Sequence, residues 1–267
     1  MLSLSFLTGR IARWFFYFLF EFICLQGYGQ HANVLSGDNS FAEPEPNSHS
    51  AILLRLMQQV DSVSHTSGIG RHFAKIYTSS MGNINVQLQG LDSGAQAFVR
   101  KFEISFINFF LEACEEYNNG SIAPESIWYF YFSHPDAEPW QLTMIGVNAH
   151  INGDIWKGLV KNFSETEIRR YKKNLLAFQS SISRAFQPFF EELLEESPYL
   201  RFMDNFTKGM ARRYGEWLIY NWRLRQINMA MLYFTDAEKF KKRFDVIQRK
   251  KKNIDDTILR NKKLPKF

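Results

Sequence analysis

Cysteine is nearly absent from this chain of 267 residues, which has only Cys24 and Cys114. Because Cys24 lies in a segment that we predict to be removed, Cys114 would stand alone, and an intrachain disulfide in the mature chain is excluded. The stretch LEACEEY surrounds Cys114 with three glutamates, which raise rather than lower the pKa of a thiol. We therefore expect Cys114 to be a small buried residue and not a nucleophile.

Common catalytic templates are also missing. The sequence has no G-x-S-x-G elbow, no H-E-x-x-H, no paired EF-hand loop, no zinc-finger spacing and no glycine-rich phosphate loop. Period-two alternation is lacking too: NINVQLQG at residues 83–90 comes nearest, and one isolated strand would have no partner. Aromatic residues are abundant instead, with 26 phenylalanines in a chain that is 45% hydrophobic. This composition excludes a disordered chain and supplies a large core rich in rings.

Apolar residues recur at steps of three and four along most of the remaining chain, which is typical of helices. Asp92 or Ser93 is the expected N-cap of a long amphipathic helix that stops at NNG, and Ser164 with Glu167 forms a capping box. Other helices are expected at 51–64, 71–81, from Pro139 onward, from 165 to 196 with a kink at Pro188, at 210–234, and in a last helix capped by Thr235 and Glu238. We predict an all-α fold: a single domain of about seven helices at residues 51–236, in an antiparallel or orthogonal bundle.

The N-terminal residues 1–29 resemble an export signal. Two arginines precede the apolar run WFFYFLFEFICL, and the small residues of GYGQ provide a cleavage site before Gln30. We predict a signal peptide or, alternatively, an uncleaved anchor, although the run is shorter than the ~20 residues of a membrane span. The expected location is the periplasm or the cell envelope. Residues 30–50 are polar, carry two prolines and are predicted to be a linker.

The net charge of +5 is concentrated at the C-terminus. Residues 237–267 hold twelve basic and four acidic side chains, and residues 1–29 hold two and one, which leaves residues 30–236 at −4. We predict a basic C-terminal helix or tail that is solvated. Nucleic-acid binding is not expected, and contact with an anionic membrane surface is the alternative.

The stretch MIGVNAHINGDIW, residues 144–156, carries the candidate chemistry. His150 and Asp154 stand four positions apart, so on a helix they can share a hydrogen bond or one metal ion. Spacing alone is weak evidence, because six histidines and 27 acids should give about 2.4 such pairs by chance and the chain has four. His134 or His72 could complete a metal site with an open position.

A helical projection is more informative than the spacing. His150 and Asp154 share a narrow polar face, whereas Asn148 and Asn152 fall within the apolar arc, where an amide without partners costs about 1 to 3 kcal/mol. In one interpretation the polar face is solvated and the asparagines bond to a neighbouring helix or loop. In the other, the helix is surrounded on all sides and the polar face meets an internal cleft, which two flanking glycines, Gly146 and Gly158, leave open to a ligand or another backbone.

The segment PESIWYFYFSHPDAEPWQLTMIGVNAHINGDIWKGLV resembles the core of a bacterial family known only as domain of unknown function number 5995. Members carry a proline and a tryptophan, then an apolar helix that ends in N-A-H-I-N-x-D-L. Residues 148–152 and Asp154 match this pattern, and Ile155 replaces the usual leucine. The resemblance implies an all-helical fold and gives weight to His150 and Asp154, but it brings no substrate or activity.

The likeness extends over about residues 70–235. In WLIYNWR, Trp217 and Arg223 look like the family's later tryptophan and arginine, and Ile227 stands where a further tryptophan is expected. Members of the family mostly lack export signals, so the N-terminal segment is a departure from the pattern.

Three functions remain open from the sequence. The first is an exported metal-assisted hydrolase of a small molecule, in which His150 and Asp154 bind a divalent metal or act as an oriented base pair. In it Asn148 and Asn152 form a surrounding polar layer, and Arg223 meets an anionic substrate group. The second is a non-catalytic binding module at the envelope with an aromatic cleft. The third is a structural helical protein whose polar residues specify helix packing.

Overall fold

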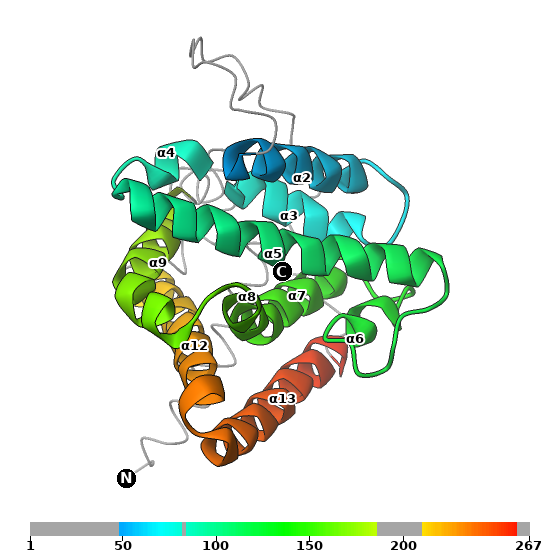
Figure 1. Ribbon diagram of the computed structural model, residues 1–267. Helices are drawn as coiled ribbons and strands as arrows, with labels where there is room; N and C mark the ends of the chain where they lie inside the picture. Colours follow the sequence, from blue (N-terminus) through cyan, green and yellow to red (C-terminus); the bar gives the residue numbers. More distant parts are fainter. Residues whose placement is uncertain (1–47, 82–83, 186–209, 261–267) are drawn as a thin grey trace.

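The computed structural model describes residues 48–81, 84–185 and 210–260, and every regular element within them is a helix (Figure 1). The helices are α2 (His49–Ser64), α3 (Arg71–Met81), α4 (Ile84–Leu88), α5 (Ser93–Asn118), α6 (Tyr129–Phe132), α7 (Pro139–Ala149), the π-helical turn η2 (His150–Asp154), α8 (Ile155–Asn162), α9 (Glu165–Ala185), α12 (Met210–Thr235) and α13 (Ala237–Arg260). The predicted all-α fold is confirmed. The predicted signal or anchor, nearly all of the linker, the Pro188 kink and the last seven residues lie outside the described segments.

Local sequence explains where the long helices begin and end. Asp92 caps α5 by accepting a hydrogen bond from the Ala95 amide at 2.8 Å, and the chain leaves the helix at Gly120, whose φ of +67° suits glycine. The predicted box before α9 is also present: the Glu167 carboxylate accepts from the Ser164 amide at 2.9 Å. At the last helix the cap is Asp236, which accepts from a backbone amide of α13, rather than the predicted Thr235.

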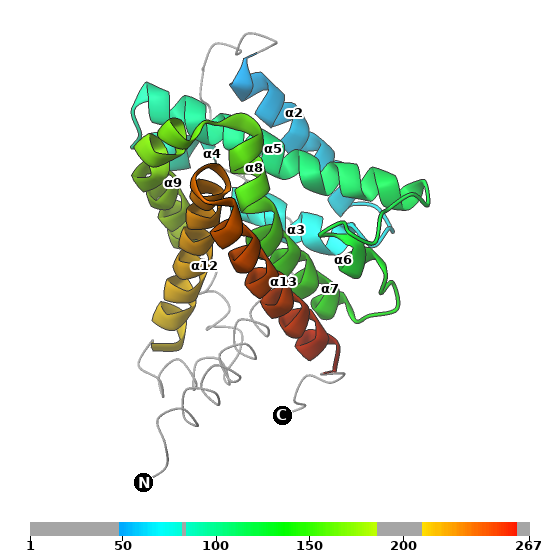
Figure 2. The ribbon, with the colours of Figure 1, turned by 60° about the horizontal axis from the view of Figure 1, so that its bottom comes forward.

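One continuous helix, made of α7, η2 and α8, lies at the centre of the bundle (Figures 1 and 2). α7 packs against α3 and α13, and α8 packs against α5 and α12. From Gln141 to Ala149 the residues of α7 are buried, except for the half-buried Val147, so this part of the helix is covered on all sides. The interpretation of an enclosed central helix is confirmed, and the solvated polar face is wrong for His150 and Asp154, which are 6% and 2% exposed.

The basic C-terminal helix was predicted to be solvated, but one side of it is instead packed on this centre. α13 runs along α7 (Figure 2) and buries a stripe that includes the ion pair between Lys251 Nζ and Asp255 Oδ2, 2.9 Å apart. Three further lysines, Lys239, Lys242 and Lys252, pair with acids three or four residues away. Part of the basic charge is thus compensated within the helix itself or by the Asp236 cap.

Two other properties of the described segments bear on the predictions. Cys114 is buried, and burial raises the pKa of its thiol to about 12, so it is the small buried residue that its neighbours indicated. Among the described helices, none is apolar over a length sufficient to cross a bilayer.

Candidate acid-base site on the central helix

The central helix changes its winding at the residues that the sequence singled out. Residues His150–Asp154 form a π-helical turn, where the spacing had predicted a plain α-helix. Inside this turn the Asn152 carbonyl accepts a hydrogen bond from Gln226 Nε2 of α12 at 2.9 Å, and a side chain at Gly153 would collide with Ile127. Single π turns within α-helices occur frequently at functional sites.

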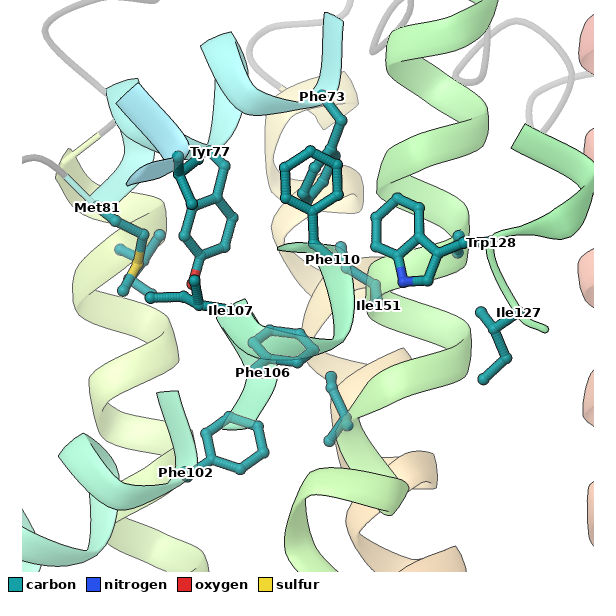
Figure 3. Close-up of a cluster of buried hydrophobic side chains, with 14 of the residues drawn as sticks. Phe73, Tyr77, Met81, Phe102, Phe106, Ile107, Phe110, Ile127, Trp128 and Ile151 are labelled. Carbon is teal, nitrogen blue, oxygen red and sulfur yellow. The ribbon is translucent and has the colours of Figure 1, made fainter. Parts of the chain in front are cut away.

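The ring of His150 is enclosed by aromatic side chains. It stacks on Phe106 with ring centroids 3.4 Å apart, and the rings of Phe73 and Tyr77 meet it edge-on at 5.0 and 5.1 Å. Figure 3 shows Phe106, Phe73 and Tyr77 in one cluster of buried side chains together with Trp128. Within the described part of the chain, neither ring nitrogen of His150 has a hydrogen-bond partner.

Burial decides the charge of this histidine. It lowers the pKa of His150 well below the ordinary value, and the positive charge of Arg223 lowers it further. The ring is therefore neutral at physiological pH. Buried polar atoms without partners are rare, but His150 is not among the residues that line the pocket described below.

Asp154 is held by one of its oxygens. Trp128 Nε1 donates a hydrogen bond to Oδ2 at 2.9 Å, and His150 Nδ1 lies 3.8 Å from the same oxygen. Burial raises the pKa of Asp154 to about 7, an effect that Lys157 and the Trp128 hydrogen bond only partly oppose. Near neutral pH the carboxyl group is therefore divided between its protonated and ionised forms.

The other oxygen of Asp154, Oδ1, accepts no hydrogen bond from any described residue. Asp154 lines a pocket of about 160 Å³ between α5, residues 126–128 and the central helix. Glu112 and Glu116 of α5 line the same pocket and are exposed, so the pocket reaches the surface. The site thus has a buried carboxyl at its inner end and an open mouth.

Sequence reasoning missed a second buried carboxyl, Glu103 of α5, which is 1% exposed. Tyr77 Oη donates to its Oε2 at 3.0 Å, and burial raises its pKa to about 7 although Tyr77 and Arg223 lower it. Burial also lowers the pKa of Arg223 to about 10. The available signal was the position of Glu103 three residues before Phe106, on the apolar face of α5.

The asparagines of the motif lie toward α13. Asn148 Nδ2 donates to the Lys251 carbonyl at 3.0 Å and to Asp255 Oδ1 at 2.7 Å, and Asn152 Nδ2 donates to Asn148 Oδ1 at 2.8 Å. The predicted bonding to a neighbouring helix is confirmed for Asn148, whereas the Asn152 amide bonds to Asn148 on its own helix. Neither asparagine lines the pocket, nor does Arg223, so their predicted contacts with a bound group remain predictions.

The two flanking glycines admit aromatic rings. A Cβ at Gly146 would lie 2.9 Å from Phe73 Cβ, and one at Gly158 would lie 3.3 Å from Phe102 Cε2. The close approach that the glycines permit is therefore used by core packing.

The other histidines lie apart from the pair. His134 lies two residues after α6, with its Nδ1 2.7 Å from the Phe130 carbonyl oxygen. His72 accepts a hydrogen bond from Arg71 Nε at 3.3 Å, and burial lowers the pKa of His72 to about 4. In the segments that the structure describes, no group of three His, Cys, Asp or Glu side chains is arranged to hold a metal ion. The ligand set His150, Asp154 and His134 stays a prediction.

Comparison with known proteins agrees with the resemblance seen in the motif. The model of a family described as "Family of unknown function (DUF5995)" matches residues 50–259, which span the helices from α2 to α13 and the whole pocket. No curated protein and no solved structure matches the chain. Because the match covers most of the sequence and ends within α13, the chain belongs to this family of unknown function, DUF5995.

Proposed function

We propose that the protein is an enzyme that hydrolyses a small molecule by acid-base catalysis, with Asp154 as the proton-carrying group. One observation carries the proposal: Asp154 is 2% exposed, its Oδ2 is fixed by Trp128, and its Oδ1 has no partner among the described residues although Asp154 lines a pocket. If the only role of Asp154 were to accept the hydrogen bond from the Trp128 indole, the residue would not need to line a pocket.

The raised pKa suits this role. General acid-base catalysis is most efficient when the pKa of the group lies near the operating pH, and that of Asp154 is about 7. In the ionised form, Oδ1 would take a proton from a water molecule that attacks the substrate. In the protonated form it would deliver the proton to the leaving group, so one residue can serve both halves of a hydrolysis.

His150 would support this carboxyl. Its Nδ1 lies 3.8 Å from Asp154 Oδ2, longer than a hydrogen bond, and such contacts often tighten only when substrate binds. A neutral imidazole that donates to the ionised carboxylate would hold it in place without adding charge. The metal-assisted version of the hypothesis uses the same two side chains as ligands and needs further ligands from water or substrate.

The stacking of His150 on Phe106 at 3.4 Å favours a rival role as a core residue that specifies packing. Replacement of His150 by glutamine separates the two roles. If His150 supports Asp154, the variant loses activity and shifts the pKa of Asp154. If it only packs, stability changes and the pH profile does not.

The test is hydrolysis of a panel of esters, amides and phosphoesters small enough for the pocket, by the wild-type chain and by Asp154→Asn. The matched control is Asp245→Asn, which alters an exposed carboxyl of α13. We expect turnover by the wild type and the control, and a loss of about 10²- to 10⁴-fold in Asp154→Asn. Equal rates in all three proteins would overturn the proposal, and binding of panel compounds without turnover would favour the binding module instead. Export to the envelope and contact of the C-terminal helix with lipid stay proposals from the sequence.

A further inference from the structure

We propose that the pocket takes a small organic cation, whose ammonium group meets Asp154. The inference rests on the proposed function only in placing the ligand against Asp154, and it would hold equally for a binding module. Two properties of the pocket support it, its charge and its unpartnered oxygen, and its volume limits the size of the ligand.

The charge of the lining side chains is mostly negative. Glu112 and Glu116 lie one turn apart on α5 and form one side, Asp154 lies at the inner end, and Lys157 is the one cation among the lining residues. In the described segments no ion pair joins Lys157 to any of these three carboxyls. At the inner end, Lys157 lowers the pKa of Asp154 more than Glu112 raises it. Once Asp154 is ionised, the three carboxylates outnumber Lys157, so a cation that enters meets a net negative charge.

Asp154 supplies the second, independent argument. Only 2% of the residue is exposed, and its Oδ1 accepts a hydrogen bond from no described residue. An ammonium group offers three N–H donors and a positive charge, the complement of a carboxylate oxygen that borders a pocket. A carboxylate ligand would instead place its own two acceptor oxygens against Asp154 Oδ1, which is also an acceptor.

The size of the pocket limits the ligand. Phe109, Ala113, Ile127 and Trp128 line it beside the charged residues, but polar atoms provide most of its exposed surface. Because its volume of about 160 Å³ is close to that of a cavity that holds one benzene molecule, the ligand is no larger than a molecule such as benzylamine.

Three probes that share one ring and differ in charge test the inference: benzylamine, benzyl alcohol and benzoate. Binding to the full chain is measured by calorimetry at pH 8, where Asp154 is mostly ionised given its pKa of about 7. We expect benzylamine to bind most tightly and benzoate most weakly, with the affinity for benzylamine alone falling as salt is added. Benzoate binding as tightly as benzylamine, or no binding of benzylamine, would overturn the inference.

Single substitutions then identify the charges responsible. Glu112→Gln and Glu116→Gln should each weaken benzylamine binding about two- to fivefold and leave benzyl alcohol unchanged, the size expected for exposed charges. Lys157→Gln should strengthen benzylamine binding. The matched control is Glu115→Gln, an exposed carboxyl on the same helix that does not line the pocket. An equal effect of the Glu115 and Glu112 substitutions would contradict a site-specific charge contribution.

The outcomes for this inference and for the proposed function can be told apart. If benzylamine binds as expected but Asp154→Asn hydrolyses the panel as fast as the wild type, only the acid-base role fails. If hydrolysis depends on Asp154 and benzoate is the tightest probe, only the cation assignment fails.

Discussion

Replacement of Asp154 by asparagine should stabilise the protein at alkaline pH. The carboxyl of Asp154 has its pKa raised from 3.8 to about 7 because folding buries it. A raised pKa means that the folded chain binds the proton more tightly than the unfolded chain does. The contribution of Asp154 to the free energy of unfolding of the wild type is therefore most favourable below about pH 4. It is lost progressively as the pH rises to about 7 and then stays constant. Asparagine cannot ionise, and its amide oxygen can still accept from Trp128 Nε1.

The magnitude follows from the shift. A difference of about 3 pKa units at about 1.4 kcal/mol per unit gives about 4 kcal/mol of free energy of unfolding at pH 8.5. The variant should therefore be more stable than the wild type by roughly this amount at pH 8.5 and nearly equal to it at pH 4. Glu103 titrates in the same range, but it is present in both proteins, so its contribution cancels in the difference.

The assay is urea unfolding of both proteins at a series of pH values from 4 to 8.5, with the free energy taken from linear extrapolation. The decisive quantity is the difference in free energy of unfolding between variant and wild type as a function of pH. A difference that does not change with pH, or a variant that is less stable than the wild type at pH 8.5, would show that burial does not raise the pKa of Asp154. The former would mean that the carboxyl is solvated or paired in the folded protein.

Three further predictions concern the packing around the site. Asn148→Ala removes two hydrogen bonds to α13 and leaves buried acceptors unpaired, so it should lower the free energy of unfolding by about 2 to 4 kcal/mol while benzylamine affinity, measured by calorimetry, stays unchanged. Gly153→Ala places a Cβ against Ile127 and should lower the melting temperature, whereas Gly90→Ala, which meets nothing within 4 Å, should not; equal melting temperatures would contradict the close packing at the π turn. In a chain whose other cysteine is replaced, Cys24→Ser, the thiol of Cys114, with its pKa raised to about 12, should react with a disulfide reagent only after denaturant is added, and rapid reaction of the native protein would show that it is accessible.

The helices and their ends could be predicted from local signals. Asp92, Pro139 and Ser164 start helices through contacts within a few residues, and these are the interactions that a sequence pattern records directly. The motif also indicated a polar pair inside an apolar helix. Whether that pair was solvated or enclosed depended on α3, α5, α12 and α13, which are far apart in the sequence and come together only in the fold.

The contacts of the site were harder to predict from the sequence, because they also join residues that are far apart in the chain. The Trp128 hydrogen bond to Asp154 joins residues 26 positions apart, and so does the bond from Tyr77 to Glu103. The high net charge of α13 predicted a solvated helix, although one side of it is buried. Two charged residues, Lys251 and Asp255, lie on that buried side as an ion pair. A charged residue on an apolar helix face, as with Glu103, is the signal that sequence patterns do offer for such positions.

The proposed function requires Asp154 to bind and release a proton near neutral pH at the inner end of the pocket. The most direct test is a carbon-13 NMR titration of the Asp154 side-chain carboxyl in the folded wild-type chain, with and without saturating benzylamine. We expect a midpoint near pH 7 that moves to lower pH when the amine is bound, because a cation favours the ionised carboxylate. A midpoint near 4, unchanged by the amine, would contradict the account.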